Sequence, residues 1–464
     1  MAGSDFIRTP QSVPLIRTKY RRIRTMIPAP GSLSILNDLE KYESRSMHGQ
    51  MPVVWDKAEG FSVFDACGNQ WIDFTSTIFV ANAGHSNPGV IRAIRGQLDR
   101  KLLHTYVFAS GVRAKFLKKL IESTPKQFQK AFLLSAGTEA TECALKLMRM
   151  HGRTIRKSKL AVISFRGAMH GRTMAAEMLK GNPGTASWIG YSDPNIYHLP
   201  VPYPWAAPAS KKNYDWGRHF ERDMNALKKN GLDFRDIAGF MIESYLGWGA
   251  IFYPREYIQR MAEFAARFNG LLAFDDIQGG FGRTGKLFAY QHYGVKPDLL
   301  CLGKAMSGSL PLSAVIGPSS IMDLPGTGSM SSTHSANPLS CAAGLATLYA
   351  IEEGGLVKES YRKGKILHSF LNALKSRYSD RIGYVFGKGM LAGVIFKDPA
   401  EGKPDSSFPT KVCERAMQKG LLLVHTGRES IKIGPPLMIP DDALLEGLRV
   451  LEESMEEIIA EGTP

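Results

Sequence analysis

Two neighbouring stretches decide the fold: LLAFDDIQGGFGRTG at residues 271–285 and LLCLGKAMSGS at residues 299–309. Each begins with four apolar residues and reaches a charged side chain within two further positions, Asp275 in the first and Lys304 in the second. Short unbroken apolar runs are typical of parallel strands buried on both faces. Because ligands bind beyond the carboxyl ends of such strands, both charges are predicted to lie at a cleft.

Similar apolar runs alternate with helical patterns through the middle of the chain. Besides the two strands above, strands are predicted at 131–134, 160–164 and 239–242, with helices at 138–150 and 255–268. Strands that alternate with helices predict an α/β fold, in which a mainly parallel sheet is flanked by helices on both faces.

The length of 464 residues exceeds what one hydrophobic core usually serves, so two packed units that share a cleft are expected. Residues 1–75 are predicted to form an N-terminal arm and a segment of the small domain, with a hairpin or meander at 53–74. Residues 76–340 would form the large domain. Residues 341–464 would form a smaller α/β domain, with a long helical segment, strands at 382–386 and 391–396, and helices at 408–419 and 441–461.

The chain is basic, with a formal net charge of +15. This charge suits nucleic acid, an anionic surface, or acidic substrates and cofactors. Its densest cluster lies between Arg17 and Arg24, where a solvated arm is favoured over a nucleic-acid patch because no recognition motif lies nearby. The arm is expected to cover the cleft or a dimer seam, and the sequence leaves both open.

The five cysteines are scattered and form no CxxC pair, which suits a reducing compartment and gives no zinc or redox motif. No metal ligands are predicted. The chain shows neither a signal-peptide pattern nor an apolar run that could span a bilayer. A cytoplasmic protein with no membrane association is therefore expected.

Asp275 and Lys304 make chemical sense as a pair. Alone, Asp275 is more simply a capping residue, and Lys304 a surface lysine. Together, a lysine in a desolvated cleft has a lowered pKa and can act as a Schiff-base nucleophile. A nearby carboxylate can keep a pyridine nitrogen protonated, so that the ring takes up electrons.

A phosphate site is predicted where the strand at 131–134 runs through SAGTEA (135–140) into a helix. The backbone N–H groups of the turn from Ser135 to Thr138, together with the helix dipole, suit a phosphate dianion. Most turns of this kind are only helix caps, so this motif is weak evidence by itself.

Over nearly its whole length the chain resembles the class III pyridoxal-phosphate-dependent aminotransferase family. The order and spacing of several segments carry this resemblance: VFDACGNQWIDFTSTIFVANAGHSNP (63–88), SAGTEA, GAMHGRT (167–173), DDIQGGFGRTG, LGKAMSGSLPLSAVIG (302–317), STHSANPLSCAA (332–343) and IKIGPPLMIP (431–440). The resemblance implies an aspartate-aminotransferase-like fold of type I, with a large domain that binds pyridoxal 5'-phosphate (PLP).

The resemblance also implies roles for individual residues. Lys304 would carry PLP as a Schiff base and later move a proton, while Asp275 would pair with the ring nitrogen. Around the ring, Ile277, Gln278 and Met169 would contact it, with Met169 in place of the family's usual aromatic residue; a thioether can cover an aromatic face. Gly137 and Thr138 would bind the phosphate together with Thr333 of the neighbouring subunit, which implies a homodimer.

The substrate side departs from the family pattern. Lys432 stands where relatives carry a carboxylate-binding arginine, and lysine lacks the planar fork of a bidentate clamp. Trp248 stands where those relatives have the glutamate that covers this arginine. His425 occupies the place of another mobile arginine, and Arg428 is either an anion anchor or a surface charge.

Three further residues are candidates. Ile78 is predicted on the substrate side, and Glu243 either lies near the substrate or caps a helix. His170 is predicted to be structural, because a lone histidine is more often so. With Trp248 and Met169 in the pocket, we expect a substrate larger or less acidic than a simple amino acid.

The sequence therefore predicts a transaminase that moves an amino group from a small-molecule donor, glutamate or alanine, to an aldehyde or ketone acceptor through Lys304. An aminomutase, a racemase or a decarboxylating transaminase on the same scaffold would share Lys304 and Asp275, and remains an alternative. A basic nucleic-acid-binding or anion-binding protein is the alternative from a different class.

Overall fold

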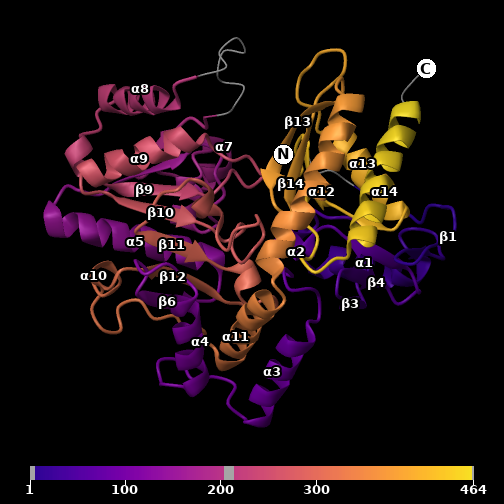
Figure 1. The fold of residues 1–464 in the computed structure, drawn as a ribbon, viewed down its shortest axis with the longest axis horizontal. Helices are drawn as coiled ribbons and strands as arrows, with labels where there is room; N and C mark the ends of the chain where they lie inside the picture. The colour runs from indigo at the N-terminus through magenta and orange to yellow at the C-terminus, as the bar shows by residue number, and fades with distance from the viewer. Residues whose placement is uncertain (1–5, 203–213, 462–464) are drawn as a thin grey trace.

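The computed structural model describes residues 6–202 and 214–461, and its centre is a seven-stranded sheet (Figure 1). Only β12 runs antiparallel to the other strands of this sheet. In order across the sheet the strands are β6 (Lys130–Leu134), β12 (Ser313–Gly317), β11 (Leu299–Leu302), β10 (Leu271–Asp275), β9 (Ile237–Glu243), β7 (Ala161–Phe165) and β8 (Ile196–Leu199). The five predicted central strands are all present, and the predicted α/β fold is confirmed.

Helices cover both faces of this sheet. Alternate strand residues such as Leu271 and Ala273 pack with helix α5 (Gly137–Ile155), whereas Leu272 and Phe274 pack on the other face, where α9 (Arg255–Arg267) contributes. Since both faces are buried, the first four positions of β10 are all apolar. Further helices of this unit are α3 (Pro88–Asp99), α4 (Gly111–Glu122), α6 (Met174–Leu179), α7 (Pro183–Ala186), α8 (Trp216–Lys229), α10 (Ser319–Met322) and α11 (Pro338–Glu353).

A second unit occupies the other half of the molecule (Figure 1). Its antiparallel sheet has the order β13 (Ile382–Lys388), β14 (Leu391–Phe396), β17 (Ser430–Ile433) and β16 (Val424–His425). Its helices are α12 (Leu356–Arg377), α13 (Ser407–Gln418) and α14 (Asp441–Glu461). The long helical segment predicted after residue 340 is two helices, because Gly355 at the break adopts a left-handed φ of 57°.

The N-terminal segment joins this second unit. After α1 (Leu33–Tyr42), the predicted meander is present as β3 (Lys57–Glu59), β4 (Ser62–Phe64) and β5 (Gln70–Asp73). It extends through β2 (Arg22–Ile23) to β1 (Ile16–Arg17), and β15 (Leu421–Leu422) pairs with β5. This pairing supports the predicted contribution of residues 1–75 to the small domain, and the division at 75 and 340 stays a prediction.

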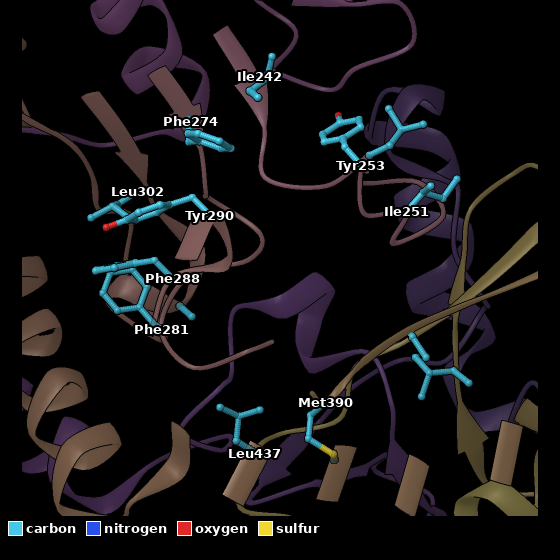
Figure 2. Packing of buried hydrophobic residues seen from close by; sticks show 14 of the residues in the cluster. Ile242, Ile251, Tyr253, Phe274, Phe281, Phe288, Tyr290, Leu302, Met390 and Leu437 are labelled. Atoms are coloured by element: carbon cyan, nitrogen blue, oxygen red, sulfur yellow. The ribbon is translucent and has the colours of Figure 1, made fainter. Parts of the chain in front are cut away.

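The two units share a core. Figure 2 shows aromatic side chains, among them Phe274 and Tyr290, packed below the large sheet, with Met390 and Leu437 from the second unit farther along the same cluster. The basic arm is anchored as well, because Lys19 and Arg21 form ion pairs with acidic residues of α14. Within the described residues, no helix is long and apolar enough to cross a membrane.

Candidate active site

Three charged residues meet at the carboxyl edge of the large sheet. Glu243 ends β9 and Asp275 ends β10, and the two are directly paired in the strand register. Lys304 follows β11, three residues after the register partner of Asp275. All three line one cavity of about 330 Å³. The sequence-predicted lysine and carboxylate therefore share a cleft.

The amine of Lys304 is free. Among residues 6–202 and 214–461 it has no hydrogen-bond or ion-pair partner, and its side chain is half-buried. Burial lowers the pKa of Lys304, while the charges of Asp275 and Glu243 act in the opposite direction. Its backbone adopts a left-handed φ of 46°, a strained conformation of the kind that collects at functional sites. A desolvated and unpaired amine is suited to nucleophilic attack on a carbonyl carbon.

Asp275 is held in place by two donors. Its Oδ1 accepts the backbone N–H of Ile277 at 3.2 Å, and its Oδ2 lies 2.9 Å from Nδ1 of His170. The other ring nitrogen of His170 lies 3.1 Å from the hydroxyl of Ser164 on β7. His170 thus orients the carboxylate and leaves the rest of that group facing the cavity.

Glu243 accepts the backbone N–H of Met169 at 2.9 Å and that of Gly247 at 3.2 Å. Burial raises the pKa of Glu243 to about 7, helped by the nearby charge of Asp275 and opposed by His170 and the two backbone donors. Glu243 does not cap a helix; it ends β9 inside the cavity.

The cavity contains a helix N-terminus. Ser135, Gly137 and Thr138 line it where β6 leads into α5. The carboxylate of Glu139 accepts the backbone N–H groups of Ser135 and Ala136, so the N–H groups of Gly137 and Thr138 are the donors left at this end. We call the part of the cavity formed by Ser135, Gly137 and Thr138 the cup. It leaves no room for a side chain at position 171, because a Cβ on Gly171 would lie 2.1 Å from Oγ1 of Thr138.

Met169, Ile277 and Gln278 also line the cavity, as predicted for residues around a ring. Gln278 connects the cavity to the second unit, because its Oε1 accepts a hydrogen bond of 3.4 Å from Nζ of Lys432 on β17. Lys432 is buried, and its amine lies 4.9 Å from the ring centre of Phe79. Burial and the charge of Lys304 lower the pKa of Lys432 to about 7, against the pull of Glu243.

The remaining substrate candidates lie outside the residues that line this cavity. The guanidinium of Arg428 stacks on Trp248, 3.9 Å from the ring centre, and contacts Glu429 at 3.3 Å. His425 is buried on β16, with Nε2 3.0 Å from the Thr410 hydroxyl. The structure does not bring Trp248, His425 and Arg428 together with Lys304.

Ile78 and Thr333 are both exposed in the single chain. Ile78 belongs to α2 (Ser76–Phe79), where all four residues have positive φ, between 46° and 69°. The main-chain carbonyl of Thr333 lies 2.8 Å from Nε2 of His104, on a surface loop. Neither residue lines the cavity of its own chain.

Comparison with known proteins decides the family. The model of the family "Aminotransferase class-III" matches residues 44–455. The chain belongs to the class III aminotransferases. A 4-aminobutyrate aminotransferase of Mycobacterium leprae is 33% identical over 93% of this chain and 97% of its own length. An alanine/serine racemase of Pyrococcus horikoshii is 29% identical over 97% of this chain and 96% of its own.

Among solved structures, a PLP-bound amine transaminase from an uncultivated Pseudomonas species superimposes with a TM-score of 0.80 at 25% identity, covering 89% of this chain and 97% of its own. The predicted family, the fold of type I and the predicted cofactor PLP are thereby confirmed. This class III aminotransferase is an enzyme of PLP-dependent transamination.

The residues of the cavity fit PLP. The free N–H groups of Gly137 and Thr138 suit its phosphate, the carboxylate of Asp275 suits its ring nitrogen, and the unpaired amine of Lys304 suits its aldehyde. The glycine at 171 supports this fit, because any side chain there would enter the cup.

Sequence reasoning missed two positioning residues. His170 lies in the loop after β7, and its contact with Asp275 at the end of β10 joins residues 105 positions apart, which a lone histidine in the sequence does not indicate. Arg283 is fully buried and donates hydrogen bonds to Asn82, to the Ser76 hydroxyl and to two carbonyls of the second unit. The GFGRTG segment contained Arg283, but no local pattern indicated that it holds the left-handed turn of α2.

Proposed function

We propose that this enzyme transfers an amino group from glutamate or alanine to an aldehyde or ketone acceptor that is larger or less acidic than a simple 2-oxo acid. The observation that carries the proposal is the free, half-buried amine of Lys304 beside Asp275. When bound, PLP supplies an aldehyde for the substrate amine and an electron-accepting ring.

In the proposed mechanism Lys304 would hold the cofactor, and its amine would move the proton at the substrate α-carbon. Asp275, oriented by His170, keeps the proton on the ring nitrogen. Gly137 and Thr138 hold the phosphate, and Met169 and Ile277 exclude water from the ring. Glu243 anchors the loop that carries Met169 through its hydrogen bond to that backbone.

The substrate preference follows from the state of the nearby cations. Lys432 is directed at Gln278 and its pKa of about 7 leaves it partly neutral. The guanidinium of Arg428 stacks on Trp248 and forms an ion pair with Glu429. Lysine lacks the planar fork of a bidentate carboxylate clamp, and Arg428 is engaged elsewhere, so an acceptor less acidic than a simple 2-oxo acid is favoured.

We further propose a homodimer in which Thr333 reaches the cofactor phosphate of the neighbouring chain. The loop at 102–108 is exposed and apolar, with Phe108 at 76% exposure, and it contacts the 331–333 loop through Tyr106 and His104. An apolar face of this kind is typical of an interface. Phe108→Glu should shift the mass measured by light scattering toward the monomer and weaken PLP binding.

The experiment that tests the function is nitrogen transfer from ¹⁵N-labelled glutamate and alanine to a panel of aldehydes and ketones, followed by mass spectrometry. The proposal predicts labelled amine product with at least one neutral acceptor. Racemised donor without transferred label would instead indicate the racemase chemistry of the Pyrococcus relative. Rearranged or decarboxylated product would indicate an aminomutase or a decarboxylating transaminase.

A further inference from the structure

A second cleft, of about 700 Å³, shares no lining residue with the cavity that contains Lys304. It is bounded by α12, by the turn between β13 and β14, and by the loop that follows β10. Six basic side chains line it, and we call it the basic cleft: Lys286, His292, Lys358, Lys365, His368 and Lys388.

No carboxylate lines the basic cleft. Its four lysines are exposed, and within the described part of the chain none has an Asp or Glu oxygen within 4.0 Å. This is unlike the other side of α12, where Arg362 pairs with Glu359 and Asp441. The cleft therefore holds four uncompensated positive charges, and a concave surface of one sign focuses the field on an anion.

The helix presents these groups as a row. Lys358, Tyr361, Lys365 and His368 follow one another at spacings of three, four and three residues, which place them on one face of α12. Lys286 and Lys388 approach from the loop after β10 and from the turn of the β13–β14 hairpin. Charges from three separate segments thus converge on one space.

The two histidines add neutral hydrogen-bonding groups. Burial and the charge of Lys388 lower the pKa of His292 to about 4, and burial also lowers the pKa of His368. Backbone hydrogen bonds with Gly389 and Leu391 act in the opposite direction on the pKa of His368, whose Nε2 is buried. Both rings therefore favour the neutral form, so the positive charge of the cleft comes from its four lysines.

Two glycines, Gly364 and Gly389, let backbone segments pack closely at one side of the basic cleft. A Cβ on Gly364 would lie 2.6 Å from backbone atoms of Gly389, and one on Gly389 would lie 2.3 Å from the carbonyl carbon of Thr284. Main chain at these glycines therefore forms part of the lining of the cleft. The ring of Tyr361, 59% exposed, stands at the wall.

We propose that the basic cleft is a binding site for a small polyphosphate anion, of the nucleoside-triphosphate class. Lysines bind phosphate as point charges, and several are needed for an anion with several negative charges. The volume lies in the range of small-molecule sites. Tyr361 offers an aromatic face on which a base can stack. A nucleic-acid strand would need an extended basic stripe, whereas these charges converge on a single cavity.

The test is calorimetric titration of the PLP-saturated enzyme with ATP and with inorganic tripolyphosphate, in buffer without divalent cations. We expect one saturable site per chain. The double variant Lys365→Gln with Lys388→Gln should weaken binding at least about tenfold, because each lysine provides a charge-assisted contact. Lys157→Gln with Lys229→Gln is the matched control, since both lysines are exposed, lie outside the cleft and form no ion pair with any residue of 6–202 or 214–461; it should retain the affinity within about twofold.

The two probes separate the sources of affinity. If ATP binds more tightly than tripolyphosphate and Tyr361→Ala removes the difference, the base is recognised; equal affinities would assign the site to polyphosphate alone, which also supports it. Absence of saturable binding, or equal weakening in both double variants, would overturn the proposal. Transaminase activity should be unchanged in all of these variants, so the outcome is independent of the reaction assigned above.

Discussion

Two lysines lie close enough for their charges to interact, and they differ in what surrounds them. Lys304 follows a strand of the large sheet and its amine is free; Lys432 lies on the small sheet, donates to Gln278 and packs on Phe79. Burial lowers the pKa of both. A depressed pKa alone therefore does not make a lysine reactive, because the amine must also be unpaired and must face the cavity.

Replacement of Lys304 should give the largest effect. Lys304→Ala should lower kcat about 10²- to 10⁴-fold, because it removes the group proposed to move the proton at the substrate α-carbon. Lys432→Met, the matched variant of the other lysine, should keep kcat for a neutral acceptor within about tenfold. Steady-state kinetics with one donor and one acceptor measure both, and equal losses would erase the distinction between the two lysines.

Asp275→Asn should lower kcat about 10²-fold or more, since an amide cannot stabilise a proton on the ring nitrogen as a carboxylate does. Asp298→Asn is a suitable control, because this aspartate precedes β11 at the opposite edge of the same sheet and bonds to the Leu272 backbone. The control should affect thermal stability more than kcat. Similar kcat values for the two variants would refute the proposed role of Asp275.

Lys432→Arg should raise kcat/KM for an acceptor that carries a carboxylate by about tenfold, because arginine can donate two hydrogen bonds to it. For a neutral acceptor the change should be less than about threefold. If Lys432→Met instead lowers kcat/KM for a carboxylate-bearing acceptor a hundredfold, the native lysine already serves as the anion anchor.

The pH dependence of thermal stability should reveal the raised pKa of Glu243. Its pKa rises from 4.5 to about 7 on folding, so its protonated form is favoured in the folded state. Glu243 therefore contributes up to about 3 kcal/mol to the free energy of unfolding. This contribution is fully present below about pH 4.5 and is lost as the pH rises through 7. Glu243→Gln removes this contribution, so wild type should lose Tm relative to the variant between pH 5 and 8. Parallel Tm curves would contradict the assigned burial.

Arg428→Ala should give the smallest effect. The stacking of Arg428 on Trp248 is worth about 0.5–1 kcal/mol at an exposed site, and KM for the acceptor should change by less than about threefold. Thermal unfolding and acceptor titration check these two expectations. A tenfold rise of KM would place Arg428 at the substrate after all.

The strand-end residues were predictable because their signal is local. An apolar run that ends in Asp275 or in Gly303-Lys304 fixes both the strand and the side chain beyond it, and SAGTEA does the same for Gly137 and Thr138. The predicted strands and helices there agree with β6, β9, β10, β11, α5 and α9 to within a few residues.

The rest depends on contacts between residues far apart in sequence. The left-handed turn at 76–79 is held by Arg283, which lies 207 residues from Ser76 in the sequence. Nothing in the sequence TSTIF predicts positive φ at four residues without glycine. The bond between Lys432 and Gln278 likewise joins two units of the fold. The antiparallel β12 was not predicted, because the direction of a strand depends on its pairing, here with β11 and β6, and not on the residues SAVIG themselves.

The most direct test of the central claim is to reduce the PLP-loaded enzyme with borohydride and to map the modified peptide by mass spectrometry. We predict that the cofactor mass is found on Lys304, and that the absorbance of the loaded enzyme near about 410–430 nm disappears on reduction, as expected for a lysine-linked conjugated ring. Recovery of the cofactor mass on Lys432, or on no lysine of this cavity, would contradict the account.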